Sequence, residues 1–145
     1  MTGSRGAARR AKPRTAPERA PLWVYSAAVC VADRRKAAAW YRDVLGFTIL
    51  DEDPEHWTTV GAPGHGARVH LCEMGISRMR SGRPPPVRNT GILLISREPL
   101  PRLYRRMSRR GVRFSMPPRE LPWGWIAKLL DPDGNEFWLM PAPDA

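Results

Sequence analysis

The side chains best suited to acid–base chemistry in this sequence are His70 and Glu136, which lie in short, strand-like apolar segments. An imidazole or a carboxylate held in such a segment can act as a general base or as a hydrogen-bond anchor for a ligand. A lone histidine on a half-buried strand can equally be a structural residue that a neighbour satisfies. Cys30 and Cys72 show neither metal nor redox spacing, so we interpret them as two reduced, buried thiols.

Six tryptophans form a second group of residues that could bind a ligand. Trp138 lies in the last strand-like segment, whereas Trp57, Trp123 and Trp125 lie on predicted strands or loops. An indole ring offers a broad apolar face for stacking against a flat, partly apolar molecule. Tryptophans in a small domain can also form its core, and Trp40, on a predicted helix, is interpreted in that way.

The composition limits the class of protein. With 145 residues, of which 42% are hydrophobic, the chain can bury one sizeable core or two small modules that share a sheet. No apolar run approaches the roughly 18 residues of a membrane helix, and the amino terminus lacks the apolar region of a secretory signal. We therefore expect a cytoplasmic protein without a membrane partner.

Much of the net charge of +10 lies in the amino-terminal arm, residues 1–21, which is rich in arginine, alanine and proline. Because this arm has no apolar period, we expect it to be disordered. A basic arm can bind the phosphates of nucleic acid, so a regulatory or nucleic-acid-binding module is one hypothesis. The arm has no interleaved aromatic residues on which bases could stack, which argues against nucleic acid as a partner.

The hydrophobic periodicity predicts a similar succession of elements in both halves of the chain. Asp33 is suited to cap a helix over residues 33–45, and Gly46 suits the left-handed position that ends it. The second predicted helix spans residues 100–110, and a proline-rich loop is predicted at residues 117–122. The predicted strands are residues 24–31, 47–50, 56–60, 67–74, 91–96, 112–115, 123–130 and 136–140.

Two such units, the second closing on the turn Asp-Pro-Asp-Gly-Asn at residues 131–135, resemble the vicinal oxygen chelate superfamily over residues 22–141. That superfamily includes glyoxalase I, extradiol dioxygenases and bleomycin resistance proteins. The resemblance implies an α+β fold in which two βαβββ modules form curled, mixed but mostly antiparallel sheets around a cavity. It divides the chain into module one at residues 22–74, a linker at 75–89, module two at 90–141 and a tail at 142–145. It also implies a homodimer by analogy.

The enzymes of this superfamily usually hold a divalent cation with four histidine or glutamate side chains. The resemblance assigns the matching positions to Ser26, His70, Gly91 and Trp138, with Thr90 replacing Gly91 if the alignment shifts by one residue. Of these, His70 is the one good ligand, and a single histidine does not hold a divalent cation against water. We therefore predict no bound metal and no cofactor.

If the four matching positions face inward, the cavity wall combines small, apolar and aromatic side chains. Such a wall suits a planar or aromatic small molecule held by stacking. The predicted ligand-binding residues are Ser26, Trp57, His70, Gly91, Leu93, Trp123, Trp125, Glu136 and Trp138. Further predicted wall residues are Ala28, Cys30, Cys72 and Met140.

The leading hypothesis is a metal-free binding protein of this superfamily that sequesters an aromatic or amphipathic metabolite or an antibiotic, as bleomycin resistance proteins do. The alternative is an enzyme of the same superfamily, a lyase, isomerase or dioxygenase, with a degenerate or absent metal site. In a metal-free isomerase, His70 or Glu136 would be the catalytic base. The positive charge of the fold domain disfavours a cationic ligand such as bleomycin itself.

Overall fold

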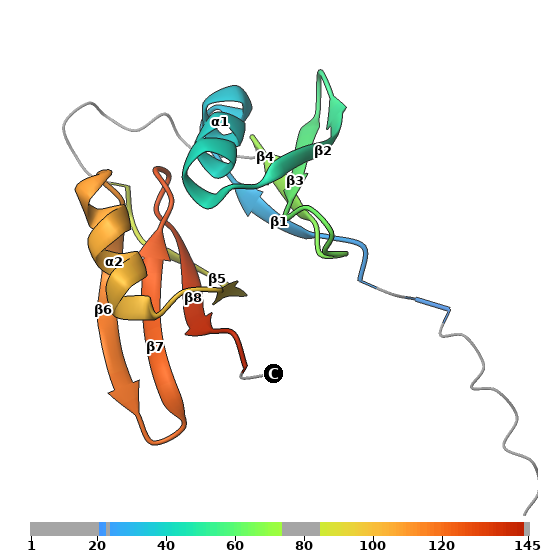
Figure 1. The fold of residues 1–145 in the computed structure, drawn as a ribbon. Coiled ribbons are helices and arrows are strands. Elements are labelled where there is room, and N and C mark those ends of the chain that lie inside the picture. Colours follow the sequence, from blue (N-terminus) through green and yellow to red (C-terminus); the bar gives the residue numbers. More distant parts are fainter. Residues whose placement is uncertain (1–20, 23, 74–84, 144–145) are drawn as a thin grey trace, which may run out of the picture.

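The computed structural model describes residues 21–22, 24–73 and 85–143. The predicted disordered arm, most of the predicted linker and the end of the tail lie outside the described residues. The described elements are β1 (Ala27–Cys30), α1 (Arg34–Leu45), β2 (Thr48–Asp53), β3 (Trp57–Gly61), β4 (Val69–Cys72), β5 (Arg88–Ser96), α2 (Leu100–Arg109), β6 (Arg113–Leu121), β7 (Gly124–Leu130) and β8 (Asn135–Pro141). Figure 1 shows that this order repeats the unit βαβββ twice.

Each βαβββ module forms its own four-stranded sheet. The strand order is β1-β4-β3-β2 in the first module and β5-β8-β7-β6 in the second. In both sheets the first and last strands of the module pair in parallel, and the other pairs are antiparallel. The predicted α+β fold with two mixed, mostly antiparallel sheets is therefore confirmed, and neither sheet closes into a barrel (Figure 1).

Each helix packs its apolar face against one face of its sheet. The other face of that sheet is not covered by a helix and is called the open face below. The carboxylate of Asp33 caps α1 by accepting a hydrogen bond from the backbone N of Lys36 at 3.0 Å, and Gly46 ends the helix with a φ of 72°. The buried side chains of the two helices are Ala37, Ala38 and Tyr41 in α1 and Leu100, Leu103 and Met107 in α2. Among the described residues, no helix is long and apolar enough to cross a membrane.

Two strands of the second module extend three or more residues beyond their predicted bounds. β6 continues through two consecutive prolines to Leu121, so the prediction of a loop at residues 117–122 is wrong. β6 is the outer strand of its sheet and its pairing with β7 shifts register at the prolines, which accommodates residues that lack a backbone N–H. β5 begins at Arg88 and not at Gly91, so the ordered part of the second module begins earlier than predicted.

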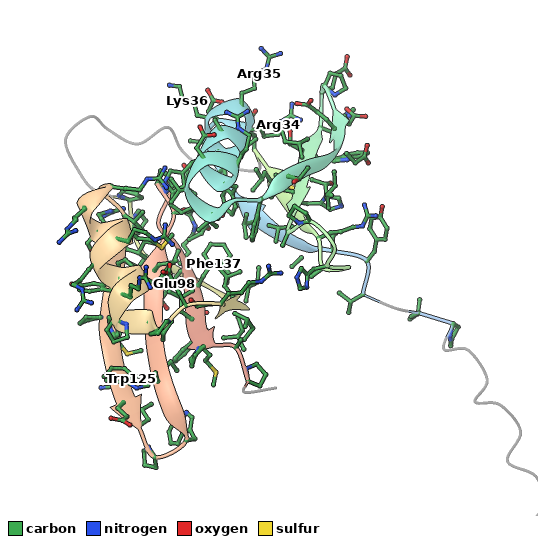
Figure 2. The ribbon with its side chains drawn as sticks, in the orientation of Figure 1. Arg34, Arg35, Lys36, Glu98, Trp125 and Phe137 are labelled. Carbon is green, nitrogen blue, oxygen red and sulfur yellow. The ribbon has the colours of Figure 1, made fainter. Side chains whose placement is uncertain are left out.

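A buried carboxylate joins the two modules. Asp131, at the turn between β7 and β8, accepts a hydrogen bond from the hydroxyl of Tyr41 in α1 at 2.7 Å. The same carboxylate accepts hydrogen bonds from Asn135 Nδ2 at 2.7 Å and from the backbone N of Asp133 and Asn135, each at 2.9 Å. Phe137, labelled in Figure 2, packs against Tyr41 with ring centroids 6.1 Å apart. One hydrophobic core therefore extends through both modules.

Two further contacts link the first module to residues at the two ends of β5. Arg88 Nη2, at the start of β5, lies 3.3 Å from the carbonyl oxygen of Cys30 at the end of β1. Just beyond the end of β5, Arg97 Nη2 lies 3.0 Å from His65 Nε2, in the loop that leads into β4.

Candidate functional site

The open face of the first sheet carries an aromatic group centred on His70. The strand register places Ala28, His70 and Thr59 in one row across β1, β4 and β3. The hydroxyl of Thr59 is hydrogen-bonded to His70 Nδ1, and Thr59 is fully buried. The ring centroids of Tyr25 and Trp57 lie 6.2 and 6.1 Å from that of the imidazole. One hydroxyl and two aromatic rings therefore fix the position of His70.

The open face of the second sheet carries Trp138 between an aliphatic and a basic side chain. The register places Leu93 of β5, Trp138 of β8 and Lys128 of β7 in one row. The ammonium of Lys128 lies 3.9 Å from the centroid of the Trp138 ring, within cation–π range, and 3.4 Å from Glu136 Oε1. Glu136 is buried, whereas Leu93 is 47% exposed. The ammonium of Lys128, paired with Glu136, thus holds the indole of Trp138 in place, and the apolar side chain of Leu93 beside it is exposed.

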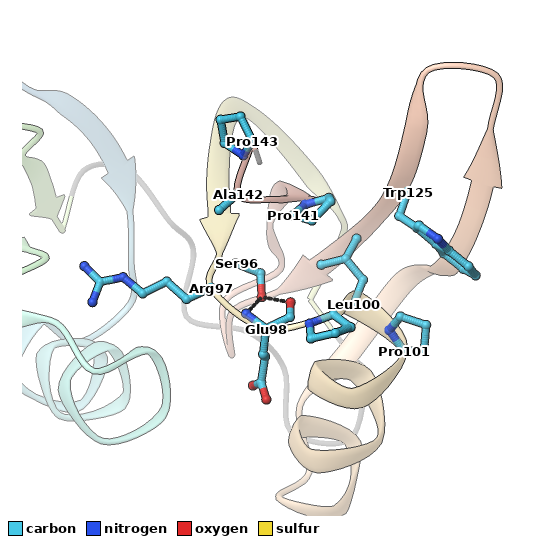
Figure 3. A pocket seen from close by; sticks show the side chains of 10 residues that line it. Ser96, Arg97, Glu98, Leu100, Pro101, Trp125, Pro141, Ala142 and Pro143 are labelled. Atoms are coloured by element: carbon cyan, nitrogen blue, oxygen red, sulfur yellow. Dashed lines mark hydrogen bonds between the residues drawn. The ribbon is translucent and has the colours of Figure 1, made fainter. Parts of the chain in front are cut away.

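Two of the predicted tryptophans do not share this face. Side chains alternate between the faces of a strand, and Trp125 shares the α2-covered face with the buried Ala127, opposite to Trp138. Trp125 lines a separate hollow of about 590 Å³ at the amino end of α2, shown in Figure 3. The other labelled residues around this hollow are Ser96, Arg97, Glu98, Leu100, Pro101, Pro141, Ala142 and Pro143. Trp123 lies in the turn between β6 and β7 and is 70% exposed.

The remaining predicted residues, Ser26 and Gly91, lie at the edges of the two sheets. Ser26 directly precedes β1 and is partly buried. Gly91 lies in an irregular stretch of β5, where the pairing with β8 shifts between Asn89 and Leu93, and its φ is 69°. A Cβ added at Gly91 would meet no atom within 4 Å, so the space beside it is open. The convergence of the four matching positions on one hollow stays a prediction.

The sequence gives little indication of three residues that contact the predicted site. Thr59 and Tyr25 adjoin His70, and Lys128 adjoins both Trp138 and Glu136. A lysine within an apolar strand is the one available signal, because lysine is seldom buried without a partner. The strand register is still needed to identify that partner, since it pairs Lys128 with Trp138 on a neighbouring strand.

The donor set of these two faces does not fit a divalent cation. Among the residues that the structure describes, no three His, Cys, Asp or Glu side chains are grouped so that they could hold a metal ion. Structural and catalytic zinc sites take at least three such ligands. His70 Nδ1 is engaged by Thr59, and the carboxylate of Glu136 is engaged by Lys128. We therefore derive no chemical step through a divalent metal.

Two open sheets, each covered by one helix on its other face and joined through the last turn, define a class of known proteins. The family model of the Glyoxalase/Bleomycin resistance protein/Dioxygenase superfamily matches residues 23–139. This chain therefore belongs to that superfamily, and the resemblance to the vicinal oxygen chelate proteins is confirmed.

Three similar proteins illustrate the range of the family. A member of the superfamily from Sphaerobacter thermophilus is 36% identical, with a TM-score of 0.67 over 83% of this chain and 97% of that chain. TnmS3, an antibiotic binding protein from Streptomyces sp. CB03234, is 28% identical, with a TM-score of 0.65 over 86% of this chain and 98% of that chain. The uncharacterized protein YetH of Bacillus subtilis is 26% identical over 120 residues, which are 77% of this chain and 92% of that protein.

Proposed function

We propose that this protein is a metal-free, small-molecule-binding member of the superfamily that sequesters an aromatic or amphipathic compound, such as an antibiotic. The observation that carries the proposal is the row of Leu93, Trp138 and Lys128 on the open face of the second sheet. An indole beside an exposed aliphatic side chain binds flat, partly apolar molecules through stacking and apolar contact.

The charges around the indole define the kind of ligand. The ammonium of Lys128 lies against both the Trp138 ring and the carboxylate of Glu136, so the positive charge is already balanced. A neutral aromatic ligand would leave this ion pair intact. The net charge of the chain is positive, which favours an anionic ligand over a cationic one. We therefore expect neutral or anionic aromatic ligands to bind more tightly than cationic ones.

The exposure of apolar side chains on the open faces of both sheets supports a second copy of the chain as a partner. Leu93 and Ile95 of the edge strand β5 are 47% and 51% exposed, and Trp57 of the first sheet is 37% exposed. Apolar side chains exposed on a sheet face that no helix covers commonly mark a binding surface or an interface. We therefore keep a cytoplasmic homodimer in the proposal, with the ligand held on the face that the dimer encloses. The similarity to an antibiotic binding protein supports the same class of ligand.

Titration with the aromatic dye anilinonaphthalenesulfonate, followed by calorimetry and dye fluorescence, tests the proposal. We expect binding by wild-type protein to be unchanged by a chelator. The Trp138→Ala variant should bind about 5- to 150-fold more weakly, because stacking on an aromatic side chain contributes about 1–3 kcal/mol. The matched control is Trp40→Phe on α1, where the ring packs on Tyr41 away from the open face. Equal affinities of the wild type and Trp138→Ala would contradict the stacking role.

The alternative function is a metal-free isomerase that uses His70 as its base. The observation in its favour is the hydrogen bond between Thr59 and His70 Nδ1, because it orients the imidazole and, when Nδ1 donates, leaves Nε2 as the basic atom. An enzyme of this kind should turn over an aromatic carbonyl compound, and the His70→Gln variant should abolish turnover while retaining binding. Binding without any turnover in the wild type would exclude this function.

A further inference from the structure

The two cysteines of the chain are direct neighbours in the first sheet. Cys30 at the end of β1 and Cys72 at the end of β4 are register partners in a parallel pair. Both are free thiols and both are partly buried. The preceding partners on the same face are Ala28 and His70, so the two thiols lie on the open face of the sheet. In the sequence they are separated by the whole first module, which conceals the pairing.

The distance between parallel strands favours a bridging ion over a direct bond between the sulfurs. Side chains of register partners point to the same side and stay about as far apart as the strands, roughly 4.7–4.9 Å. A disulfide requires Cβ atoms about 3.5–4.5 Å apart, so the strands would have to approach each other. The sulfur atoms of two thiolates on opposite sides of one metal ion are about 4.6 Å apart, which is twice a typical metal–sulfur distance of about 2.3 Å. This separation is close to the spacing of the two strands.

The backbone around both thiols is fixed by hydrogen bonds. The carbonyl oxygen of Cys72 accepts a bond from the backbone N of Val31 at 2.9 Å. The carbonyl oxygen of Cys30 accepts a bond from Asn135 Nδ2 at 2.8 Å, which ties this end of β1 to the second module. A ligand pair held in this way binds an ion with little loss of conformational freedom. The same rigidity opposes the approach of the strands that a disulfide needs.

Two arginines supply positive charge beside the pair. Burial, and then the neighbouring Cys30, raise the pKa of the Cys72 thiol. Arg34, labelled at the start of α1 in Figure 2, opposes this rise, and its guanidinium also lies 3.6 Å from Glu73 Oε1. Arg88 Nη2 lies 3.3 Å from the carbonyl oxygen of Cys30, and the buried Arg88 Nε has no hydrogen-bond partner among the described residues. Two thiolates around a monovalent cation carry one net negative charge, and these guanidinium groups would stabilise it.

We propose that Cys30 and Cys72 form a two-coordinate site for a soft monovalent cation, Cu(I). Each thiol loses its proton to solvent when the ion binds, and copper stays in the same oxidation state, so no oxidant is needed. Thiolate is the ligand type that selects Cu(I), and two opposed sulfurs satisfy an ion of low coordination number. This site is distinct from the four positions at which relatives hold a divalent cation, and it does not depend on the proposed function.

Anaerobic titration of the reduced protein with Cu(I), in competition with the chromophoric chelator bathocuproine disulfonate, tests this site. We expect one tightly held Cu(I) per chain. Removing a residue that only orients a metal ligand lowers metal affinity about 10- to 100-fold. The Cys30→Ser and Cys72→Ser variants each remove a ligand itself, so each should lose Cu(I) affinity by a larger factor. The control variant Tyr104→Phe, on α2 in the other module, keeps both thiols and should bind Cu(I) as the wild type does. X-ray absorption should show two sulfur neighbours around the copper.

A second measurement keeps the test decisive if a serine variant fails to fold. Iodoacetamide alkylation of the wild type, read by mass spectrometry, should slow at both cysteines together when Cu(I) is added. Alkylation of either cysteine at an unchanged rate would overturn the proposal. So would a wild type that releases all copper to the chelator, or one in which peroxide readily forms an intramolecular disulfide, since that outcome identifies a redox pair.

Discussion

Replacing Tyr41 by phenylalanine removes one oxygen atom from the contact that joins the two modules. The Tyr41 hydroxyl donates to Asp131 Oδ2 at 2.7 Å, and both residues are almost completely buried. A hydrogen bond to a charged group contributes about 1.5–3 kcal/mol, and we expect the free energy of unfolding to fall by that amount. For a chain of this size the midpoint of thermal unfolding falls by about 2–4 °C for each kcal/mol, so we expect a shift of about 3–12 °C.

Urea denaturation and thermal unfolding, both followed by circular dichroism, measure this effect. The matched control is Tyr104→Phe on α2, because the Tyr104 ring packs on Phe114 at 4.8 Å and its hydroxyl makes no hydrogen bond to the described residues. We expect the control to change stability by less than about 0.5 kcal/mol. If Tyr41→Phe were as stable as the control, the buried carboxylate would not depend on Tyr41, and the reasoning about how the modules are joined would be wrong.

Two further predictions concern stability. Burial, and then the neighbouring Asp131, raise the pKa of Tyr41 well above its ordinary value. The stability that Tyr41 contributes is therefore complete below the unfolded-state pKa of about 10 and is lost as the pH rises above that value. Above about pH 10 the urea midpoint of the wild type should fall with pH, and that of Tyr41→Phe should fall less steeply. In Gly134→Ala a φ of 83° is combined with a clash between the new Cβ and the carbonyl oxygen of Pro86, whereas in Gly46→Ala, at a φ of 72°, the new Cβ meets no atom within 4 Å. Gly46→Ala should therefore cost about 1–2 kcal/mol and Gly134→Ala clearly more, as measured by urea denaturation; equal costs would refute the steric argument.

Elements fixed by short-range chemistry were predictable from the sequence. The carboxylate of Asp33 and the φ freedom of Gly46 act within one helical turn, and they bound α1 where predicted. The extent of β6 depends on a long-range property, because two prolines are tolerated only on the outer strand of a sheet. The sequence does not state which strand is outermost, and for that reason a loop was expected at residues 117–122.

In the candidate site, too, some features were predictable from the sequence and others depend on long-range contacts. Strand alternation places Glu136 and Trp138 on one face from the sequence alone, and the structure agrees with that sidedness. Lys128 can be placed in the site only when the pairing of β7 with β8 is known. From the sequence alone, a lysine in a strand is expected to face solvent. Tyr41 lies in the predicted helix over residues 33–45 and Asp131 in the predicted turn at residues 131–135, and neither pattern indicates a contact between residues 90 positions apart.

A crystal structure of the protein purified without a chelator, with anilinonaphthalenesulfonate bound, tests the central claim most directly. We expect the naphthalene ring to stack on Trp138, next to Leu93 and across from Lys128, with no cation at His70. A dye molecule bound only in the hollow beside Trp125, or a divalent cation held at His70 by side chains from both sheets, would contradict the account.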